Sequence, residues 1–297
     1  MRTFVLFGLT LVVSVSALVE VQTNYHDSVG IPEAERIRLL EEEILAKNDF
    51  VQNDPLDNRI VGGVLAPTNA HPYFGGLLVD LIGGGRGVCG SSLVSPNRLV
   101  TAAHCWFDGV RQGWQVLVIL GSNFLYSGGE RIPSSHVIMH PQYFPPLLTN
   151  DVAMIYLPWN ANVNNFSVKP VRLPHGSELW NQFVGHSAVA AGFGKTSDHQ
   201  QAASTVVSHV NLHVISHAQC NVFTAGFVTM STICTSGVGG VGICGGDSGG
   251  PLVTYDNFGE PFLIGVSSFA AFNACQNGHP SGYARVTSFH NFITLHL

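Results

Sequence analysis

The chain has 297 residues, of which 45% are hydrophobic and 11% charged, and its formal net charge is −6. This apolar content is enough for a buried core and excludes a disordered protein. Residues 18–59 carry ten acids against four bases, whereas residues 60–297 carry nine acids against eight bases. The body is therefore nearly neutral and has no basic patch, so we do not expect nucleic acid as a partner.

The N-terminus has the features of a secretory signal peptide. A short basic start, Met1-Arg2, precedes an apolar run from Phe4 to Leu18, and Val15-Ser16-Ala17 forms a small-residue cleavage site. The run is too short to span a bilayer comfortably, which disfavours a membrane anchor. We expect residues 1–17 to be removed and the protein to be secreted.

The cysteines support an extracellular location. Six are present, all in the body: Cys89, Cys105, Cys220, Cys234, Cys244 and Cys275. An even number in a secreted chain predicts three disulfides, although spacing alone leaves 15 pairings open. No pair has zinc-finger spacing, and we expect neither a metal nor an organic cofactor.

Residues 18–59 differ from the body and contain no cysteine. Pro32 suits a first helical turn, and Ile37, Leu40 and Ile44 recur at helical spacing. The segment is too small to bury a core alone. It is either a solvated amphipathic helix or a propeptide helix that lies on the body before activation. Arg59, followed by Ile60, ends it as a trypsin-type cleavage site.

After Ile60, short apolar runs separated by glycine, asparagine and proline predict strands. The predicted strands are 75–81, 99–102, 114–120, 152–157, 188–192, 209–214, 251–254 and 262–267. Only the last dozen residues look helical, because Phe289, Phe292 and Ile293 share one face. An all-β body of this length fits one barrel or a pair of barrels.

Three stretches carry residues suited to nucleophilic catalysis: 101–105 (TAAHC), 150–154 (NDVAM) and 244–251 (CGGDSGGP). Ser248 is the candidate nucleophile, because the glycines around it permit a sharp turn and leave backbone N–H groups free for an oxyanion. His104 is the candidate general base, and Asp151 would hold its imidazole in the required tautomer.

The order His104, Asp151, Ser248, preceded by Ile60-Val61-Gly62-Gly63, resembles the chymotrypsin-like serine proteases. The resemblance covers residues 60–297, including 283–286 (YARV). It is greatest to the digestive chymotrypsin-like enzymes of lepidopteran insects, through residues 25–27, 30–34, 191–196 and 234–237. It implies an all-β fold of two antiparallel six-stranded barrels, about 60–172 and about 173–297. It also implies a C-terminal helix and a partly helical propeptide at 18–59.

The resemblance assigns further roles. It pairs the cysteines as Cys89–Cys105, Cys220–Cys234 and Cys244–Cys275, and it gives the oxyanion hole to the N–H groups of Gly246 and Ser248. A trypsin-like protease would cut after Arg59, and the freed amine of Ile60 would pair with Asp247. Because no cysteine ties residues 18–59 to the body, we expect the propeptide to be released after the cut.

Substrate preference is predicted from the pocket positions. In the family that the chain resembles, the position of Gly242 lines the pocket base, Ile243 follows it, and the position of Ser281 lines a second wall. The resemblance therefore implies a pocket that offers no carboxylate to Lys or Arg from these positions. Ser268-Phe269-Ala270 would offer backbone groups to an extended substrate. We expect cleavage after Phe, Tyr or Leu. Elastase-like cleavage after smaller residues and collagenolytic cleavage are the alternatives.

The remaining expectations concern location and partners. The chain has 3 Lys among its 13 basic residues, which suits an alkaline gut lumen, and Asn165-Phe166-Ser167 is a candidate glycosylation sequon. We expect a monomer that acts on polypeptides and meets protein protease inhibitors. The rival hypotheses are a non-catalytic homologue acting as a binding module, a cascade protease and a storage protein. The intact motifs and the cysteine-free segment disfavour all three.

Overall fold

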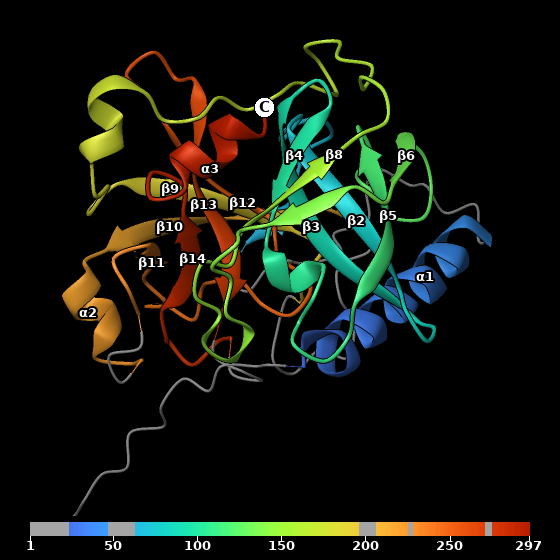
Figure 1. Cartoon of the computed structure of the whole chain (residues 1–297), viewed down its shortest axis with the longest axis horizontal. Coiled ribbons are helices and arrows are strands. Elements are labelled where there is room, and N and C mark those ends of the chain that lie inside the picture. Colours follow the sequence, from blue (N-terminus) through green and yellow to red (C-terminus); the bar gives the residue numbers. More distant parts are fainter. Residues whose placement is uncertain (1–23, 47–62, 196–205, 225–227, 271–274) are drawn as a thin grey trace, which may run out of the picture.

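The computed structural model describes residues 24–46, 63–195, 206–224, 228–270 and 275–297. The predicted signal peptide and the bond between Arg59 and Ile60 lie outside these ranges. Two antiparallel sheets of seven strands each lie side by side, and helix α1 (Ile31–Ala46) lies along the outside of one of them (Figure 1). A π-helical turn, η1 (His26–Gly30), leads into α1.

The first sheet has the strand order β6-β5-β2-β3-β4-β8-β7. Its strands are β2 (Phe74–Leu81), β3 (Arg86–Ser95), β4 (Arg98–Thr101), β5 (Gly113–Leu120), β6 (Glu130–Ser134), β7 (Val137–Met139) and β8 (Ala153–Tyr156). Alternate residues of β2 serve different cores: Leu77 and Val79 join one buried apolar cluster, and Phe74 and Leu78 join another. Burial on both faces explains the nearly continuous apolar run of this strand.

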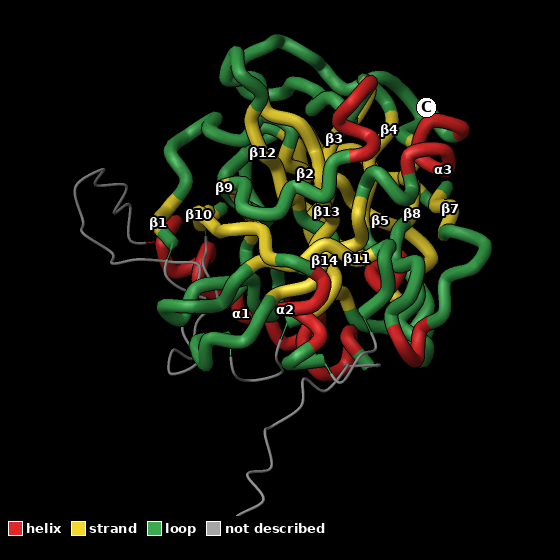
Figure 2. The backbone as a smooth tube through the Cα atoms, turned by 90° about the vertical axis from the view of Figure 1, so that its left-hand side faces the viewer, coloured by secondary structure: helices red, strands yellow, loops and turns green. Residues whose placement is uncertain are grey.

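The second sheet has the order β1-β10-β11-β14-β13-β12-β9, and a further pairing of β10 with β9 closes six of its strands into a barrel. Figure 2 shows these strands curving around a shared interior. The strands are β1 (Val64–Leu65), β9 (Ser187–Gly192), β10 (Ser208–Ile215), β11 (Thr232–Thr235), β12 (Pro251–Tyr255), β13 (Pro261–Phe269) and β14 (Ser281–Arg285).

The predicted all-β body with two barrel-like sheets is confirmed, and all eight predicted strands are present. The first sheet has seven strands, and its pairings run from β6 at one edge to β7 at the other. Six strands were not predicted: β1, β3, β6, β7, β11 and β14. The longest of them, β3, has the sequence RGVCGSSLVS, which is rich in small residues. The C-terminal helix α3 (His290–Leu295) is confirmed, with Phe289 and Ile293 buried.

The expectation that only the C-terminus of the body is helical was wrong, because a second short helix, α2 (His217–Asn221), is present. Ser216 Oγ accepts a hydrogen bond from Gln219 N, and Gln219 Oε1 accepts one from Ser216 N. This capping box starts a helix of only five residues, which is too short to produce a visible apolar period. Single 3₁₀ turns are η2 (Ala103–Cys105), η3 (Pro145–Leu147) and η4 (Gly176–Trp180).

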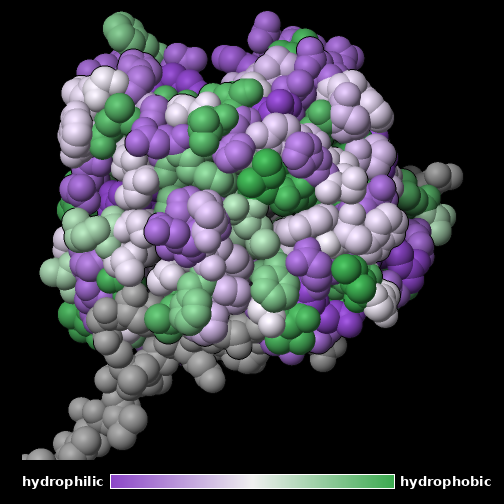
Figure 3. Space-filling view, in the orientation of Figure 1, coloured by the Kyte–Doolittle hydropathy of each residue, from purple (hydrophilic) through white to green (hydrophobic). Residues whose placement is uncertain are grey.

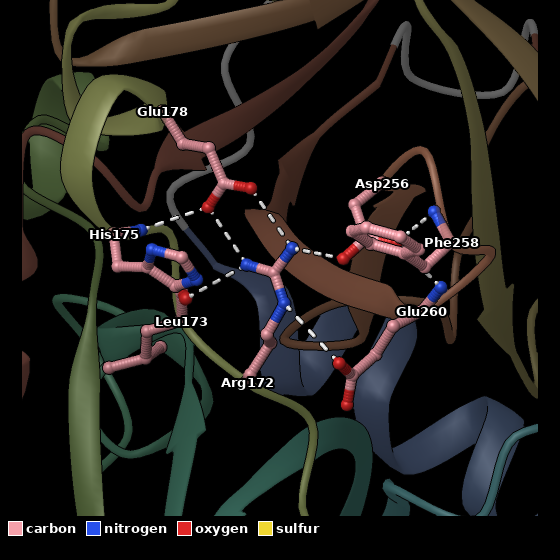
Figure 4. Close-up of polar contacts among 7 residues, drawn as sticks. All are labelled: Arg172, Leu173, His175, Glu178, Asp256, Phe258 and Glu260. Carbon is pink, nitrogen blue, oxygen red and sulfur yellow. Dashed lines mark hydrogen bonds and ion pairs between the residues drawn. The ribbon is translucent and has the colours of Figure 1, made fainter.

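Arg172 fixes the connection between the two sheets to the second of them. Its guanidinium binds Glu178 at 2.8 and 2.9 Å and Asp256 at 3.0 Å, with Glu260 at 4.0 Å (Figure 4). The guanidinium carbon also lies 4.3 Å from the ring centre of Phe262. The segment between the sheets is thereby attached to the β12–β13 hairpin.

Helix α1 is docked on the body, as the second of the two interpretations requires. Ile37 is fully buried against the first sheet, but Leu40 and Ile44 of the predicted apolar face are only partly buried. The buried face of the helix instead includes two carboxylates, Glu33 and Glu41, each 1% exposed. A buried carboxylate requires partners on the body, and both glutamates have them, as described below.

The three disulfides join Cys89 to Cys105, Cys220 to Cys234 and Cys244 to Cys275, which are the pairs that the resemblance implied. No helix within the described ranges is long and apolar enough to cross a membrane. On the face seen in Figure 3, hydrophobic residues are scattered among hydrophilic ones.

Candidate active site

The first sheet supplies a histidine–aspartate pair. His104 lies in η2, directly after β4, where the Cys89–Cys105 disulfide attaches this turn to β3. Asp151 precedes β8 and follows Asn150, whose φ of 55° makes the turn that directs the carboxylate inward. His104 Nδ1 lies 2.7 Å from Asp151 Oδ2, and the backbone N–H of His104 donates to Asp151 Oδ1 at 2.9 Å. Because a carboxylate accepts, Nδ1 carries the proton and leaves Nε2 as a base.

The second sheet supplies Ser248 from the loop before β12. The Ser248 carbonyl accepts from Gly90 N at 2.7 Å, and the next residue, Gly249, donates to Ser267 O at 2.8 Å. Gly246 has a φ of +104°, which favours glycine. The N–H groups of Gly246 and Ser248 donate to none of the described residues, so both are available to an oxyanion.

Ser268 has a contact that the sequence analysis did not anticipate. It was expected to offer backbone groups to substrate. In addition, its side chain donates to Asp151 Oδ2 at 2.6 Å, and Ser268 is 7% exposed. The carboxylate therefore accepts three hydrogen bonds, two from His104 and one from Ser268, and its orientation is fixed. A lone serine directly after a predicted strand gives no local signal for this role.

No hydrogen bond joins Ser248 to His104 in this structure. His104 Nε2 is buried and has no hydrogen-bond partner among the described residues. Beside it lies Tyr25, from the segment that precedes the body, with its ring centre 4.8 Å from that of His104. Burial raises the pKa of Tyr25, and the neighbouring Ser248 side chain opposes that rise. The Tyr25 hydroxyl therefore lies next to the Ser248 side chain.

Asp247 is enclosed beside Ser248 and is 1% exposed. Its Oδ1 accepts from Gly194 N at 2.8 Å and its Oδ2 from Cys244 N at 2.9 Å. A Cβ on Gly194 would lie 2.3 Å from Asp247 Oδ2, so only glycine leaves room for the carboxylate there. Burial raises the pKa of Asp247 from 3.8 to about 7, and no cation of the described residues pairs with it.

Three of the predicted pocket residues lie together. Ser281 Oγ accepts from Ile243 N at 3.2 Å and would lie 2.7 Å from a Cβ on Gly242. Ile243 is 4% exposed and belongs to the core cluster of the second sheet, against which Ala270 packs. The ring of Phe269 covers the backbone of Gly282. These positions present no charge, and residues 271–274 lie outside the described ranges.

The remaining predicted residues are placed as follows. Asn165 is exposed in a turn with a φ of 59°, whereas Arg59 and Ile60 are outside the described residues. Within the described chain, the one group of side chains close enough to hold a metal is Cys89, His104 and Cys105. The two cysteines form a disulfide, so this group does not fit a metal.

Two barrel-like sheets, with a histidine–aspartate pair from one and a serine in a glycine-rich loop from the other, have the arrangement of a serine hydrolase. Comparison with known proteins agrees. The Trypsin family model matches residues 60–293. A collagenase of Hypoderma lineatum is 36% identical over 238 residues, which are 80% of this chain and 86% of that protein. Brachyurin of Leptuca pugilator is 35% identical over 237 residues, which are 79% of this chain and 96% of brachyurin.

A solved structure of HL collagenase superimposes with a TM-score of 0.72 at 34% sequence identity and covers 80% of this chain and 98% of its own. The chain belongs to the trypsin family and is a serine endopeptidase.

Proposed function

We propose that the chain is a secreted digestive zymogen in which Ser248, His104 and Asp151 form the catalytic triad. The observation that carries this proposal is the fixed geometry of His104 and Asp151 beside the Ser248 loop. His104 Nε2 takes the proton of Ser248 as its hydroxyl attacks the peptide carbonyl, and returns it to the leaving amine. Water then hydrolyses the acyl-enzyme, with His104 again as the base.

The environment of Asp247 supports activation by a cut after Arg59. A buried carboxylate that accepts two N–H groups and has no described cation is costly when ionised. The new ammonium group of Ile60 would neutralise it and stabilise the adjoining oxyanion loop. A trypsin-like protease is the activator that Arg59 requires.

The uncharged pocket supports a preference for Phe, Tyr or Leu before the cut bond. Gly242 and Ser281 provide no carboxylate, and the ring of Phe269 provides an apolar wall. A broader, collagenolytic or elastase-like preference is the second candidate. The relatives named collagenase and brachyurin favour it, and so do the bulk of Ile243 and the methyl group of Ala270.

A substrate profile tests the proposal. The zymogen is cut with trypsin, the trypsin is removed, and N-terminal sequencing verifies that Ile60 is the new terminus. Initial rates are then compared for peptides that differ only in the residue before the cut bond: Phe, Tyr, Leu, Ala or Arg. We expect the fastest cleavage after Phe, Tyr or Leu, and none by Ser248→Ala carried through the same steps. A preference for Ala would replace the first candidate with the second, and preferred cleavage after Arg would refute both.

A further inference from the structure

The segment before α1 occupies the active site. Tyr25 is 6% exposed, its hydroxyl donates to Val88 O at 2.7 Å, and it lies close enough to the Ser248 side chain for that side chain to affect its pKa. Its ring packs edge-on against His104, whose Nε2 has no described hydrogen-bond partner. Tyr25 therefore lies against both the proposed nucleophile, Ser248, and the proposed base, His104. A substrate could not form a productive complex while this ring is in place.

The backbone at Tyr25 does not have the conformation of a substrate. Its φ of −58° and ψ of −47° are helical, and Ser28 N donates to Asn24 O at 3.1 Å. Peptides that are cleaved by this class of enzyme bind as extended strands, which present a carbonyl to the nucleophile. A helical turn instead brings the Tyr25 side chain, and not an extended backbone, next to Ser248. The segment therefore blocks the site without being cut there.

His26 anchors this turn in a matching site on the body. It is fully buried, its backbone N–H donates to Asp108 Oδ2 at 2.8 Å, and its Nε2 donates to Cys105 O at 3.1 Å. Burial lowers the pKa of His26 to about 4, so the ring is neutral at and above neutral pH. A Cβ on Gly87 would lie 2.5 Å from His26 Nδ1. The body thus has a glycine where the imidazole needs the space.

Helix α1 makes a second set of contacts further along. Glu41 accepts from Leu125 N at 2.7 Å and from Tyr126 N at 3.0 Å, and Tyr126 OH donates to Ala34 O at 2.9 Å. Glu33 pairs with Lys195 at 3.2 Å, next to the loop that contains Asp247. These polar contacts flank Ala34 and Ile37, which complete an apolar cluster of the body.

None of these contacts depends on the peptide bond after Arg59, since the last of them, at Glu41, lies 18 residues before Arg59. Cleavage would leave all of them in place. We propose that residues 24–46 are an active-site inhibitor that remains bound noncovalently after the cut, so that activity appears only when this segment dissociates or is digested. The absence of a disulfide is therefore not sufficient for release, contrary to the expectation from the sequence. This inference rests on the proposed function.

Dilution of the cut wild-type protein tests the inference without any substitution. After cleavage at Arg59 and removal of trypsin, we expect the propeptide fragment to elute with the body on gel filtration at micromolar concentration. Activity per mole of enzyme, measured as an initial rate on a short peptide, should rise about tenfold or more on dilution from about 1 μM to about 1 nM. Separate elution together with constant specific activity would overturn the inference.

Two variants identify the contacts responsible. Gly87→Ala alters only the body and should displace His26, and Tyr25→Ala removes the ring that packs against His104. We expect both to have close to full activity at micromolar concentration immediately after the cut. Glu42→Gln, an exposed neighbour of Glu41 on the same helix, is the matched control and should behave as the wild type does.

These variants also separate the two proposals. If Gly87→Ala and the wild type are equally active at once after the cut, the enzyme is a protease but the segment is not its inhibitor. If no variant cleaves any peptide although Ile60 is the new terminus, the proposed function is refuted and the inference with it.

Discussion

Replacement of Asp247 by asparagine should have opposite effects before and after the cut. In the uncut chain, burial raises the pKa of Asp247 from 3.8 to about 7. A carboxyl group whose pKa is higher in the folded state favours folding while it is protonated and opposes folding once it is ionised. Its cost therefore grows as pH rises from about 4 to about 7 and is constant above that. Three pKa units correspond to about 4 kcal/mol as an upper value.

Asparagine removes the charge but keeps only one accepting oxygen for the two N–H groups of Gly194 and Cys244. The lost hydrogen bond should cost about 1–2 kcal/mol. We therefore expect Asp247→Asn to stabilise the uncut chain by about 2 kcal/mol at pH 8 and to give no gain at pH 4.5. Urea unfolding of both proteins in a Ser248→Ala background, at the two pH values, measures this difference without self-digestion.

After the cut, the same substitution removes the partner of the Ile60 ammonium group, so the variant should be destabilised at pH 8 and nearly inactive. Equal effects of Asp247→Asn on the uncut chain at pH 8 and pH 4.5 would refute the argument from the buried charge. Full activity of the cut variant would refute the role of Asp247 in activation.

Three other substitutions give separate tests. Arg172→Met should lower the free energy of unfolding by about 1–3 kcal/mol in urea titration, since charged hydrogen bonds to carboxylates are lost, and an unchanged midpoint would contradict this. Ser268→Ala should lower kcat about tenfold with little change in KM, because Asp151 loses a donor, and an unchanged kcat would show that this hydrogen bond does not matter. Gly246→Ala should lower kcat by about a hundredfold or more. Alanine is strained at a φ of +104°, and its Cβ would lie 3.0 Å from Gly194 Cα, so the oxyanion N–H would be displaced. Gly176→Ala, at an exposed positive φ with open space around it, is the control and should retain activity.

The sequence predicted the parts of the site that are encoded in short motifs. Ser248 is recognisable because a glycine-rich loop is local, and His104 because small residues and a cysteine frame it. Asp151 was identifiable because a strand follows directly. The eight apolar runs were correctly assigned to strands, whereas β3 was not, since its burial comes from pairing between two neighbours and not from its own residues.

The contacts of the N-terminal segment could not be predicted in this way. Tyr25 and Glu41 bind partners that lie 63 and 84 residues further along the sequence. No local sequence pattern indicates contacts over such separations. The apolar spacing of Ile37, Leu40 and Ile44 pointed to a slightly different face, because the buried face contains two carboxylates. Glutamates in a helix of this composition normally face solvent, so their burial became visible only with their partners on the body.

The division of the site between two sheets has a consequence for how this enzyme would fail. His104 and Asp151 come from one sheet, while Ser248 and Ser268 come from the other, and the hydrogen bond of Ser268 with Asp151 crosses between them. A misplacement of reacting groups by about 1 Å can cost about a hundredfold in rate. A small shift of one sheet relative to the other would then lower the turnover rate while both sheets are still folded. Under mild heating or denaturant, loss of activity should precede the loss of β structure seen by circular dichroism.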